Sequence, residues 1–349
     1  MSDSNRYAPG GRDTSQSVRI TSDGLKKLSV AKIFRDNKRT ITSLDFDDTG
    51  EVCITAAEDE SLQLYDCLEG RHLKTLYSKK YGVHLARFTH RKSNVIYAST
   101  KEDDTLRYLS LHDNKYIRYF RGHKDRVVSL EMSPVGDQFL SAAVNDTVRL
   151  WDLRSSTCQG LINVTGRPCI GFDPAGLIFA VAFDSSVIRL YDMKAYDKGP
   201  FITFSGPPND AHQSSRAEWT SLRFSNDGKK ILVTTSGDMH FVLDAFHGSF
   251  EKRLTGHVSV SAPNLGGNEA CFTPDGRYVL SGSQDGGVHL WDLESKSQDT
   301  RSMHVFEAHT APTGITGFNP KYMMMVTGCS ELAFWEPKLS SKPGWSDSR

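Results

Sequence analysis

Apolar and polar residues alternate in short runs along most of the chain, which is the pattern of β-strands with one buried face. Seven of these runs end in an aromatic residue or Leu followed by a small polar or acidic residue: LQLYD (62–66), LRYLS (106–110), VRLWD (148–152), IRLYD (188–192), HFVLD (240–244), VHLWD (288–292) and LAFWE (332–336). The chain is therefore predicted to be all-β and built from a repeated unit.

A second signal lies upstream of each run, where a Phe or Met leads into a polar turn: FDDTG (46–50), FTHRK (88–92), MSPVG (132–136), FDPAG (172–176), FSNDG (224–228), FTPDG (272–276) and FNPKY (318–322). Between the two signals runs another apolar strand, such as ILVTT (231–235). The seven runs that end in an aromatic residue or Leu plus a polar residue form the third strand of each unit, and their ends are spaced 44, 42, 40, 52, 48 and 44 residues apart. That spacing is typical of WD repeats, whose units form the four-stranded blades of a β-propeller.

The fourth strand of each blade indicates how the ring closes. It follows the third strand in each unit before the next Phe-turn signal, as in YIRYF (116–120) and FITF (201–204), but nothing equivalent follows the seventh unit. One unassigned strand, LSVAKIF (28–34), precedes the first blade. Pairing it with the last blade would remove two open sheet edges. We therefore expect a seven-bladed WD-repeat propeller over residues 28–337, closed by an N-terminal strand that completes the last blade.

Segments outside this repeat have compositions typical of chain ends and loops. Residues 1–27 and 338–349 are rich in Ser, Asp, Gly and Lys, so mobile tails are expected there. The two long steps are explained by insertions at 205–217 and 258–269, which are expected to form exposed loops on one rim. Whether these loops carry function or only length variation stays open.

Composition narrows the classes of function. The 42 basic and 42 acidic residues cancel, so no overall field draws the chain to nucleic acid or membrane, and neither partner is expected. No run of 18 apolar residues is present to cross a bilayer. The six cysteines form no CxxC pair, which favours free thiols over disulfides or a zinc site. No cofactor and no metal are expected.

Two blades match the hydrogen-bonded tetrad of WD repeats, which joins a loop His, a strand Ser, a turn Asp and a strand Trp. The matching residues are His257, Ser281, Asp285 and Trp291 in blade six, and His123, Ser141, Asn145 and Trp151 in blade three. Asn145 stands at the Asp position, which predicts a neutral bond there in place of a charge-assisted one. Such networks tie the turns of one blade together. No nucleophile elbow, P-loop, GxGxxG or HExxH motif is present, so we expect no catalytic residues.

One basic region breaks the overall charge balance. Residues 71–126 contain fourteen Lys or Arg against five Asp or Glu, so cations dominate this part of the chain alone. Cations alternate there with aromatic rings, which suits an acidic or phosphorylated extended peptide. The alternative is an ordinary solvated strand edge protected by charge. The candidate binding residues are Tyr77, Lys79, Lys80, Tyr81, Lys115, Arg118, Tyr119 and Arg121.

Strand alternation within 115–121 separates these side chains. It places Tyr116, Arg118 and Phe120 on one face and Ile117, Tyr119 and Arg121 on the other. One face must pack against the blade. Either Arg118 or Arg121 is therefore expected to be a structural ion-pair residue.

Several longer segments resemble one particular WD-repeat family: TLYSKKYG (75–82), DDTLRYLSLHDNKYIRYFRGH (103–123), CQGL (158–161), FDPAGLIFA (172–180), DKGPF (197–201), EWTSLRFSNDGKKIL (218–232) and DAFHG (244–248). The family is the WD-repeat subunit shared by COMPASS-type histone methyltransferases and by nuclear cleavage–polyadenylation and phosphatase complexes. The resemblance implies a nuclear, non-catalytic scaffold. Two other classes stay open: a substrate receptor of a ubiquitin ligase, and a propeller enzyme with carboxylates or histidines at the channel mouth.

The resemblance also implies partners. One is the N-terminal region of a histone methyltransferase that acts on lysine 4 of histone three. Another is a disordered regulatory subunit of a phosphatase or cleavage–polyadenylation complex that serves transcription termination and RNA 3′-end formation. A third is the phosphorylated C-terminal repeats of RNA polymerase II, which suit the basic, aromatic region.

Overall fold

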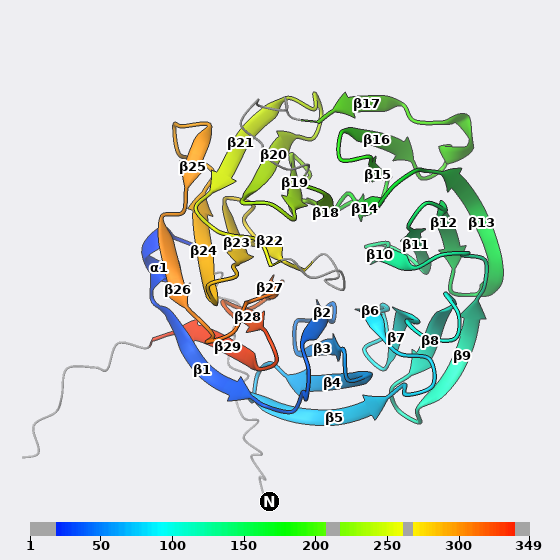
Figure 1. The fold of residues 1–349 in the computed structure, drawn as a ribbon, viewed down its shortest axis with the longest axis horizontal. Coiled ribbons are helices and arrows are strands. Elements are labelled where there is room, and N and C mark those ends of the chain that lie inside the picture. Colours follow the sequence, from blue (N-terminus) through cyan, green and yellow to red (C-terminus); the bar gives the residue numbers. More distant parts are fainter. Residues whose placement is uncertain (1–18, 207–216, 261–267, 339–349) are drawn as a thin grey trace, which may run out of the picture.

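The computed structural model describes residues 19–206, 217–260 and 268–338, which form seven β-sheets arranged in a ring (Figure 1). The predicted seven-bladed propeller is confirmed. One edge strand of each sheet lies nearest the centre of the ring, and the opposite edge lies at the periphery. The outer parts of both expected tails, 1–18 and 339–349, and the centres of the two insertions, 207–216 and 261–267, lie outside the described residues.

Blades one to four each contain four consecutive antiparallel strands. The strands are β2 (Ile41–Phe46), β3 (Val52–Ala57), β4 (Ser61–Asp66) and β5 (Arg71–Tyr77) in blade one, and β6 (His84–Phe88), β7 (Asn94–Ala98), β8 (Leu106–Ser110) and β9 (Lys115–Phe120) in blade two. They are β10 (Val127–Met132), β11 (Gln138–Ala143), β12 (Thr147–Asp152) and β13 (Ser155–Asn163) in blade three, and β14 (Cys169–Phe172), β15 (Ile178–Phe183), β16 (Val187–Asp192) and β17 (Ile202–Ser205) in blade four. A 3₁₀ turn, η1 (Tyr196–Lys198), precedes β17.

Blade five differs because it gains a strand from the next repeat. It contains β18 (Trp219–Phe224), β19 (Lys230–Thr235), β20 (Met239–Asp244), β21 (Phe250–Thr255) and, parallel to β21, β25 (Asp299–Arg301). Blade six contains β22 (Ala270–Phe272), β23 (Tyr278–Gly282), β24 (Gly287–Asp292) and the short outer strand β26 (His304–Glu307). The repeat pattern predicts one outer strand per unit, so β25 was not expected.

Blade seven joins the two ends of the ring. It contains β27 (Ile315–Phe318), β28 (Met325–Gly328), β29 (Leu332–Pro337) and β1 (Leu28–Phe34), so the expected closure is confirmed. β1 runs antiparallel to β29, with Leu28 opposite Pro337 and Phe34 opposite Leu332. The ring of Phe34 lies 4.7 Å from that of Tyr65 in blade one, so the closing strand also packs against the next blade.

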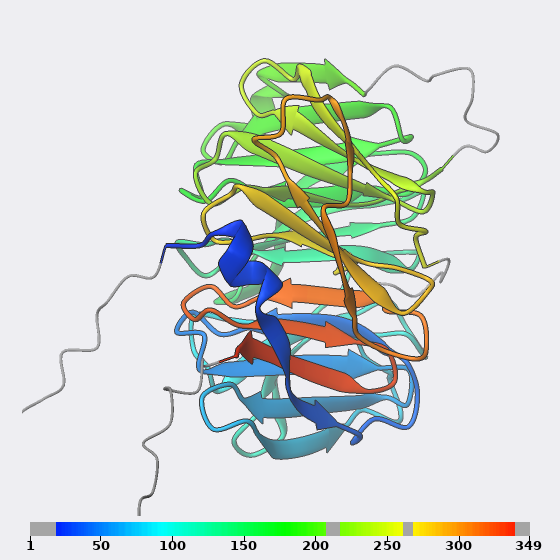
Figure 2. The ribbon, with the colours of Figure 1, turned by 90° about the vertical axis from the view of Figure 1, so that its left-hand side faces the viewer.

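The expected N-terminal tail ends earlier than residue 27. Residues Ser22–Lys26 form a short helix, α1, capped by the Thr21 hydroxyl, which accepts from the Gly24 N–H at 3.1 Å. Leu25 is fully buried in a cluster with Tyr278 of blade six and Trp335 of blade seven. Figure 2 shows α1 in dark blue on the outside of the ring, immediately before β1. Because Leu25 buries apolar surface there, the folded domain begins before residue 28.

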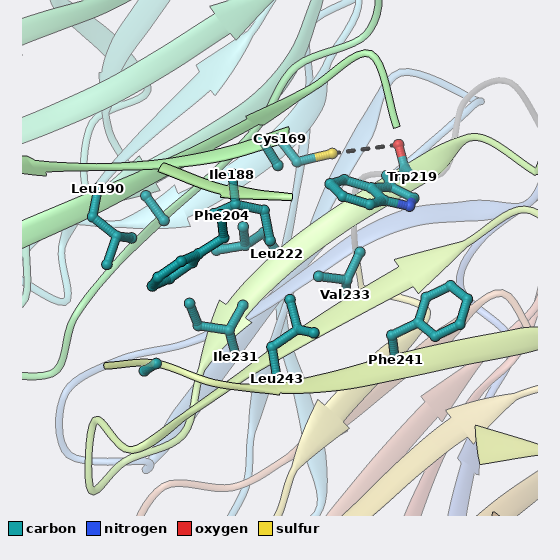
Figure 3. Packing of buried hydrophobic residues seen from close by; sticks show 13 residues of the cluster. Cys169, Ile188, Leu190, Phe204, Trp219, Leu222, Ile231, Val233, Phe241 and Leu243 are labelled. Atoms are coloured by element: carbon teal, nitrogen blue, oxygen red, sulfur yellow. Dashed lines mark hydrogen bonds between the residues drawn. The ribbon is translucent and has the colours of Figure 1, made fainter. Parts of the chain in front are cut away.

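The core consists of apolar clusters between neighbouring blades. Between blades four and five, Ile188 and Leu190 of β16 pack with Leu222, Ile231 and Val233 of β18 and β19 (Figure 3). Successive side chains along each strand point to opposite faces of the blade, and each face packs against a neighbouring blade, so both faces are buried. The result is a rigid frame that holds the loops and outer strands. No helix in the described residues is long and apolar enough to cross a bilayer.

Candidate functional site: a tyrosine–cation surface at blades one and two

The loop between β5 and β6 sets the position of Tyr81. The N–H groups of Tyr81 and Gly82 donate to the carbonyl of Ser78 at 3.2 and 2.7 Å. Gly82 has a φ of 67°, and a Cβ there would collide with the Thr100 side chain, so glycine is required. The carbonyl of Tyr81 accepts from the N–H groups of Thr100 and Lys101, both at 2.9 Å. Tyr81 is therefore held firmly where blades one and two meet.

Three tyrosine rings are in contact beside this loop. The Tyr81 and Tyr116 centroids lie 6.1 Å apart and those of Tyr116 and Tyr119 lie 5.5 Å apart. The hydroxyls of Tyr97 and Tyr116 share a hydrogen bond of 3.0 Å, which anchors the middle ring to the buried strand β7. The outer strand β9 and the β5–β6 loop, about forty residues apart in sequence, thus form one surface.

Arg107 lies beneath these rings. Its Cζ is 3.6 Å from the Tyr81 ring centroid and 5.8 Å from that of Tyr119. The side chain is almost completely buried, and its Nη1 and Nη2 donate to the two carboxylate oxygens of Asp103 at 2.9 and 3.1 Å. A buried guanidinium paired in this way gives the rings a fixed support.

The Arg107–Asp103 pair also determines the ionisation of the carboxyl. Partial burial opposes ionisation of Asp103, but the hydrogen bonds from Arg107 and from the Thr105 N–H outweigh it, so its pKa lies below the usual value. Arg107 was not among the predicted binding residues. Its contact with Tyr81 joins separate parts of the chain, and its position opposite Tyr119 depends on the β8–β9 register, so the sequence alone does not indicate either.

Exposed cations cover the rings. The distances to the ring centroids are 5.3 Å for Lys79 Nζ over Tyr77, 5.1 Å for Lys80 Nζ over Tyr81 and 5.2 Å for Arg121 Cζ over Tyr119. Within the described residues, none of these three cations lies in a salt bridge with a carboxylate. We call Tyr77, Lys79, Lys80, Tyr81, Tyr116, Tyr119 and Arg121 the tyrosine–cation surface.

Two of the predicted binding residues lie elsewhere. Lys115 is at the opposite end of β9, where its Nζ is 3.6 Å from the Asp113 carboxylate. Arg118 turns toward blade three and donates to the main-chain carbonyl of Leu153. Arg118 is therefore the structural member of the pair Arg118 and Arg121, although it binds a carbonyl and not the expected carboxylate.

The expected division of strand faces was wrong for Tyr116. Phe120 packs against Phe139 and Trp151 of blade three, as alternation predicts. Ile117, however, is an extra residue in β9, because Tyr108 pairs with Arg118 while Leu109 pairs with Tyr116. Such a β-bulge shifts the alternation by one residue. Tyr116 therefore lies on the same side as Tyr119.

The blade-three tetrad uses Asp146 and not Asn145. His123 Nδ1 is 2.9 Å from Asp146 Oδ2, His123 Nε2 is 2.6 Å from Ser141 Oγ, and Trp151 Nε1 donates to Ser141 Oγ at 2.8 Å. Asn145 has a left-handed φ of 47°, and its side-chain oxygen accepts from the Gly166 N–H at 2.9 Å. The charge-assisted bond that the sequence analysis considered lost is therefore present.

In blade six the predicted chain of hydrogen bonds does not form. His240 of blade five contacts the hydroxyl of Ser281 through its Nε2 at 3.0 Å, in the place expected for His257. Trp291 Nε1 donates to the carbonyl of Thr255 at 3.0 Å, and Asp285 accepts from the Gly287 N–H at 2.9 Å. The ring of His257 instead lies against that of His240, with centroids 4.1 Å apart.

A polar cavity of about 410 Å³ lies beside the β5–β6 loop. Its lining includes Glu58, Glu60, His84, Lys101 and Arg126. Burial, together with the nearby arginine charges, lowers the pKa of His84 to about 3. A general acid or base works best with a pKa near the working pH, so His84 is poorly suited to proton transfer. No group of three or more His, Cys, Asp or Glu in the described part of the chain is placed to hold a metal ion.

Comparison with known proteins identifies the family. The family model described as "WD domain, G-beta repeat" matches residues 29–66, 114–152 and 248–292. Over 321 residues the chain is 46% identical to "WD repeat-containing protein 82" of Drosophila melanogaster, covering 92% of this chain and 98% of that protein. It is 37% identical to "Set1 complex component swd2" of Schizosaccharomyces pombe, covering 91% and 99%. It is 38% identical to "COMPASS component SWD2" of Saccharomyces cerevisiae, covering 91% and 98%. The chain belongs to the Swd2 family of WD-repeat proteins.

The matched WD repeats of this Swd2-family chain are offset from its blades by one strand. The match at 29–66 runs from β1 of blade seven to β4 of blade one, and that at 114–152 runs from β9 of blade two to β12 of blade three. Each repeat therefore begins with the outer strand of one blade and ends with the third strand of the next. This offset makes the terminal strand β1 necessary for closure. It also places the tyrosine–cation surface across two sequence repeats.

Proposed function

We propose that this protein is a non-catalytic scaffold subunit of a nuclear COMPASS-type complex that methylates lysine 4 of histone three. Two relatives that carry the names "Set1 complex component" and "COMPASS component" align with it over nearly their whole lengths. The chain thus shares the complete propeller with them, and not a single repeat. Its part in the complex would be to bind the N-terminal region of the methyltransferase.

The tyrosine–cation surface is the proposed binding site for an extended acidic or phosphorylated segment of a partner. The observation that carries this proposal is that Lys79, Lys80 and Arg121 lie over tyrosine rings without carboxylate partners in the described residues. Cations in this state can bind carboxylate or phosphate, and the rings add contact area at low entropic cost. The buried Arg107, paired with the exposed carboxylate of Asp103, holds the rings in place before the ligand arrives.

A second assembly is proposed from the sequence resemblance. It is the cleavage–polyadenylation and phosphatase complex of transcription termination, in which the protein would hold a disordered regulatory subunit. The phosphorylated C-terminal repeats of RNA polymerase II are a further candidate ligand. Support from the structure is chemical, since the same exposed cations suit phosphoserine as well as Asp or Glu.

The competing functions have less support. A ubiquitin-ligase substrate receptor would need a surface for an adaptor, and the only helical elements in the described residues are α1, with five residues, and the 3₁₀ turn η1. An enzyme would need a group poised for chemistry at the channel mouth. The polar cavity beside the β5–β6 loop offers the neutral His84 and the ion pair between Lys101 and Glu60.

Fluorescence anisotropy with labelled polymerase repeat peptides, phosphorylated and unphosphorylated, tests the proposed site. Reversing Lys79 and Lys80 to Glu should weaken binding of the phosphorylated peptide by about tenfold or more at low salt. The loss should shrink as salt screens the charges. The matched control reverses Lys194 and Lys198, two exposed lysines of blade four, and should leave affinity unchanged. Equal affinity for the two peptides, or equal effects of the two double variants, contradicts the proposed site.

A further inference from the structure

Blade five shows how an outer edge of this propeller accepts an additional strand. β25 lies parallel to β21, with Arg253 opposite Asp299 and Thr255 opposite Arg301. The Arg253 N–H donates to the carbonyl of Gln298 at 2.8 Å, and the Thr255 carbonyl accepts from the Ser302 N–H at 3.2 Å. These two residues of β21 therefore direct their backbone groups outward. Arg253 also binds the carboxylate of Asp299 at 3.0 Å.

The register of β9 in blade two matches that of β21. Phe120 pairs with Leu106 as Leu254 pairs with His240, and these partners occupy the same place in LRYLS and HFVLD. Both outer strands also have their extra residue at the same point of the ladder. Tyr119 and Arg121 therefore correspond to Arg253 and Thr255.

Antiparallel pairing fixes which backbone groups of an edge strand face outward. In the same register, the outward N–H and C=O groups belong to Tyr119 and Arg121. The sheet order of blade two ends at β9, so no strand of the described chain pairs with this edge. The position that β25 fills in blade five is open in blade two.

The residues at the two outward-facing positions, Tyr119 and Arg121 in blade two, differ from their equivalents in the other blades. These positions hold Thr75 and Tyr77 in blade one, Leu161 and Asn163 in blade three, Thr203 and Ser205 in blade four, Val305 and Glu307 in blade six, and Ile33 and Arg35 in blade seven. Arg35 already binds Glu331 at 2.7 Å. Only β9 combines an aromatic residue with a cation that has no carboxylate partner in the described residues.

We infer that an extended acidic segment of a partner polypeptide binds the edge of β9 as a fifth strand of blade two. The inference rests on the proposed function, since the same surface would supply the side-chain contacts. The backbone of the segment would pair with Tyr119 and Arg121, and one of its carboxylates would bind Arg121 as Asp299 binds Arg253. Ile117, which is 45% exposed on the same strand, adds an apolar contact. Because a strand must present N–H groups at alternate residues, proline-rich segments are excluded.

Backbone methylation of a bound peptide tests strand addition directly. Synthetic 20-residue peptides that tile the N-terminal region of the proposed histone methyltransferase partner are screened against the full-length protein, and the tightest is N-methylated one residue at a time. Methylation at every second residue should weaken binding about tenfold, and at the intervening residues should have little effect. Binding without this alternation overturns strand addition and leaves the proposed function standing. Failure of every tile and of the phosphorylated repeat peptides overturns both.

A protein-side comparison separates the backbone from the ring. Tyr119→Ala removes the ring and keeps the N–H, whereas Tyr119→Pro removes both; proline is tolerated on an edge strand where the N–H faces outward. Tyr119→Pro should bind the peptide several-fold more weakly than Tyr119→Ala. Thr75→Pro, at the corresponding position of blade one, should bind as the wild type does. Equal affinities of the two Tyr119 variants, or a loss at Thr75→Pro alone, overturn the inference. If Tyr119→Pro does not fold, the alternation in the peptide series decides.

Discussion

Arg118 and Lys252 occupy the same register position in the outer strands of blades two and five, and each donates its side chain to a main-chain carbonyl of the following blade. Arg118 binds the carbonyl of Leu153, and Lys252 Nζ binds that of Ser297 at 2.8 Å. Lys74 repeats the contact from blade one, with its Nζ 2.7 Å from the carbonyl of Leu111. A cation at this position therefore joins neighbouring blades. The basic residues of this segment have two separate roles, since Arg118 joins blades two and three while Arg121 belongs to the exposed surface.

The two arginines of β9 should respond differently to truncation. Arg118→Ala removes a bond to a carbonyl of blade three and should lower the free energy of unfolding by about 1–3 kcal/mol. Arg121→Ala should change it by less than about 0.5 kcal/mol, because Arg121 is exposed and its side chain lies over the Tyr119 ring. Urea unfolding of both variants provides the measurement. Equal destabilisation would mean that Arg121 is also structural and would remove it from the binding surface.

The blade-three tetrad predicts an opposite ranking for two adjacent residues. Asp146→Ala leaves the buried His123 without its carboxylate partner and should cost about 1–3 kcal/mol of unfolding free energy. Asn145→Gly keeps the left-handed backbone and loses only the bond to the Gly166 N–H, so it should cost about 1 kcal/mol or less. Chemical unfolding of the two variants is compared. A larger loss for Asn145→Gly would restore Asn145 as the tetrad residue.

The fold could be predicted because its signals are local and repeated. The closing strand β1 could be predicted because the strand at 28–34 had no blade of its own and the seventh blade had no fourth strand. The features that were missed depend on contacts between repeats. Arg107 of β8 supports the ring of Tyr81, which lies in the β5–β6 loop. The three residues of β25 pair with blade five, although the residues before and after them in the sequence belong to blade six.

Local backbone geometry explains the other errors. The bulge at Ile117 moved Tyr116 to the opposite face, and alternation alone cannot reveal an extra residue. Asn145 takes the left-handed conformation that Asn adopts more readily than most residues, which leaves the tetrad position to Asp146. The consecutive Asn145 and Asp146 in this turn are the signal in the sequence for that arrangement.

The short helix before β1 should contribute to stability. Leu25 is fully buried between blades six and seven, so Leu25→Ala should lower the free energy of unfolding by about 2–5 kcal/mol. Lys26→Ala, at the exposed neighbouring position, is the matched control and should change it by less than about 0.5 kcal/mol. Thermal and urea unfolding of the full-length variants report both. If Leu25→Ala unfolds like Lys26→Ala, residues 22–26 do not belong to the folded unit.

The histidines between blades five and six make stability depend on pH. His257 is 2% exposed and packs against His240 and, at 5.3 Å between centroids, against Trp291. Burial, aided by the charge of His289, lowers the pKa of His257 to about 4. In the unfolded chain a histidine takes up its proton near pH 6.5. The unfolded state therefore binds more protons than the folded state between these two values.

Burial of neutral His257 therefore makes the free energy of unfolding depend on pH. The contribution is fully present above pH 6.5 and falls by about 3 kcal/mol in all as the pH falls toward 4. Asp45 acts in the opposite sense, because burial raises its pKa to about 7 and the folded state then gains protons as the pH falls. The comparison that isolates His257 is thus between variants. His257→Gln should be less stable than the wild type at pH 7, and this deficit should shrink by about 2 kcal/mol at pH 4.5. A deficit of the same size at both pH values would show that His257 is not the group that takes up the proton.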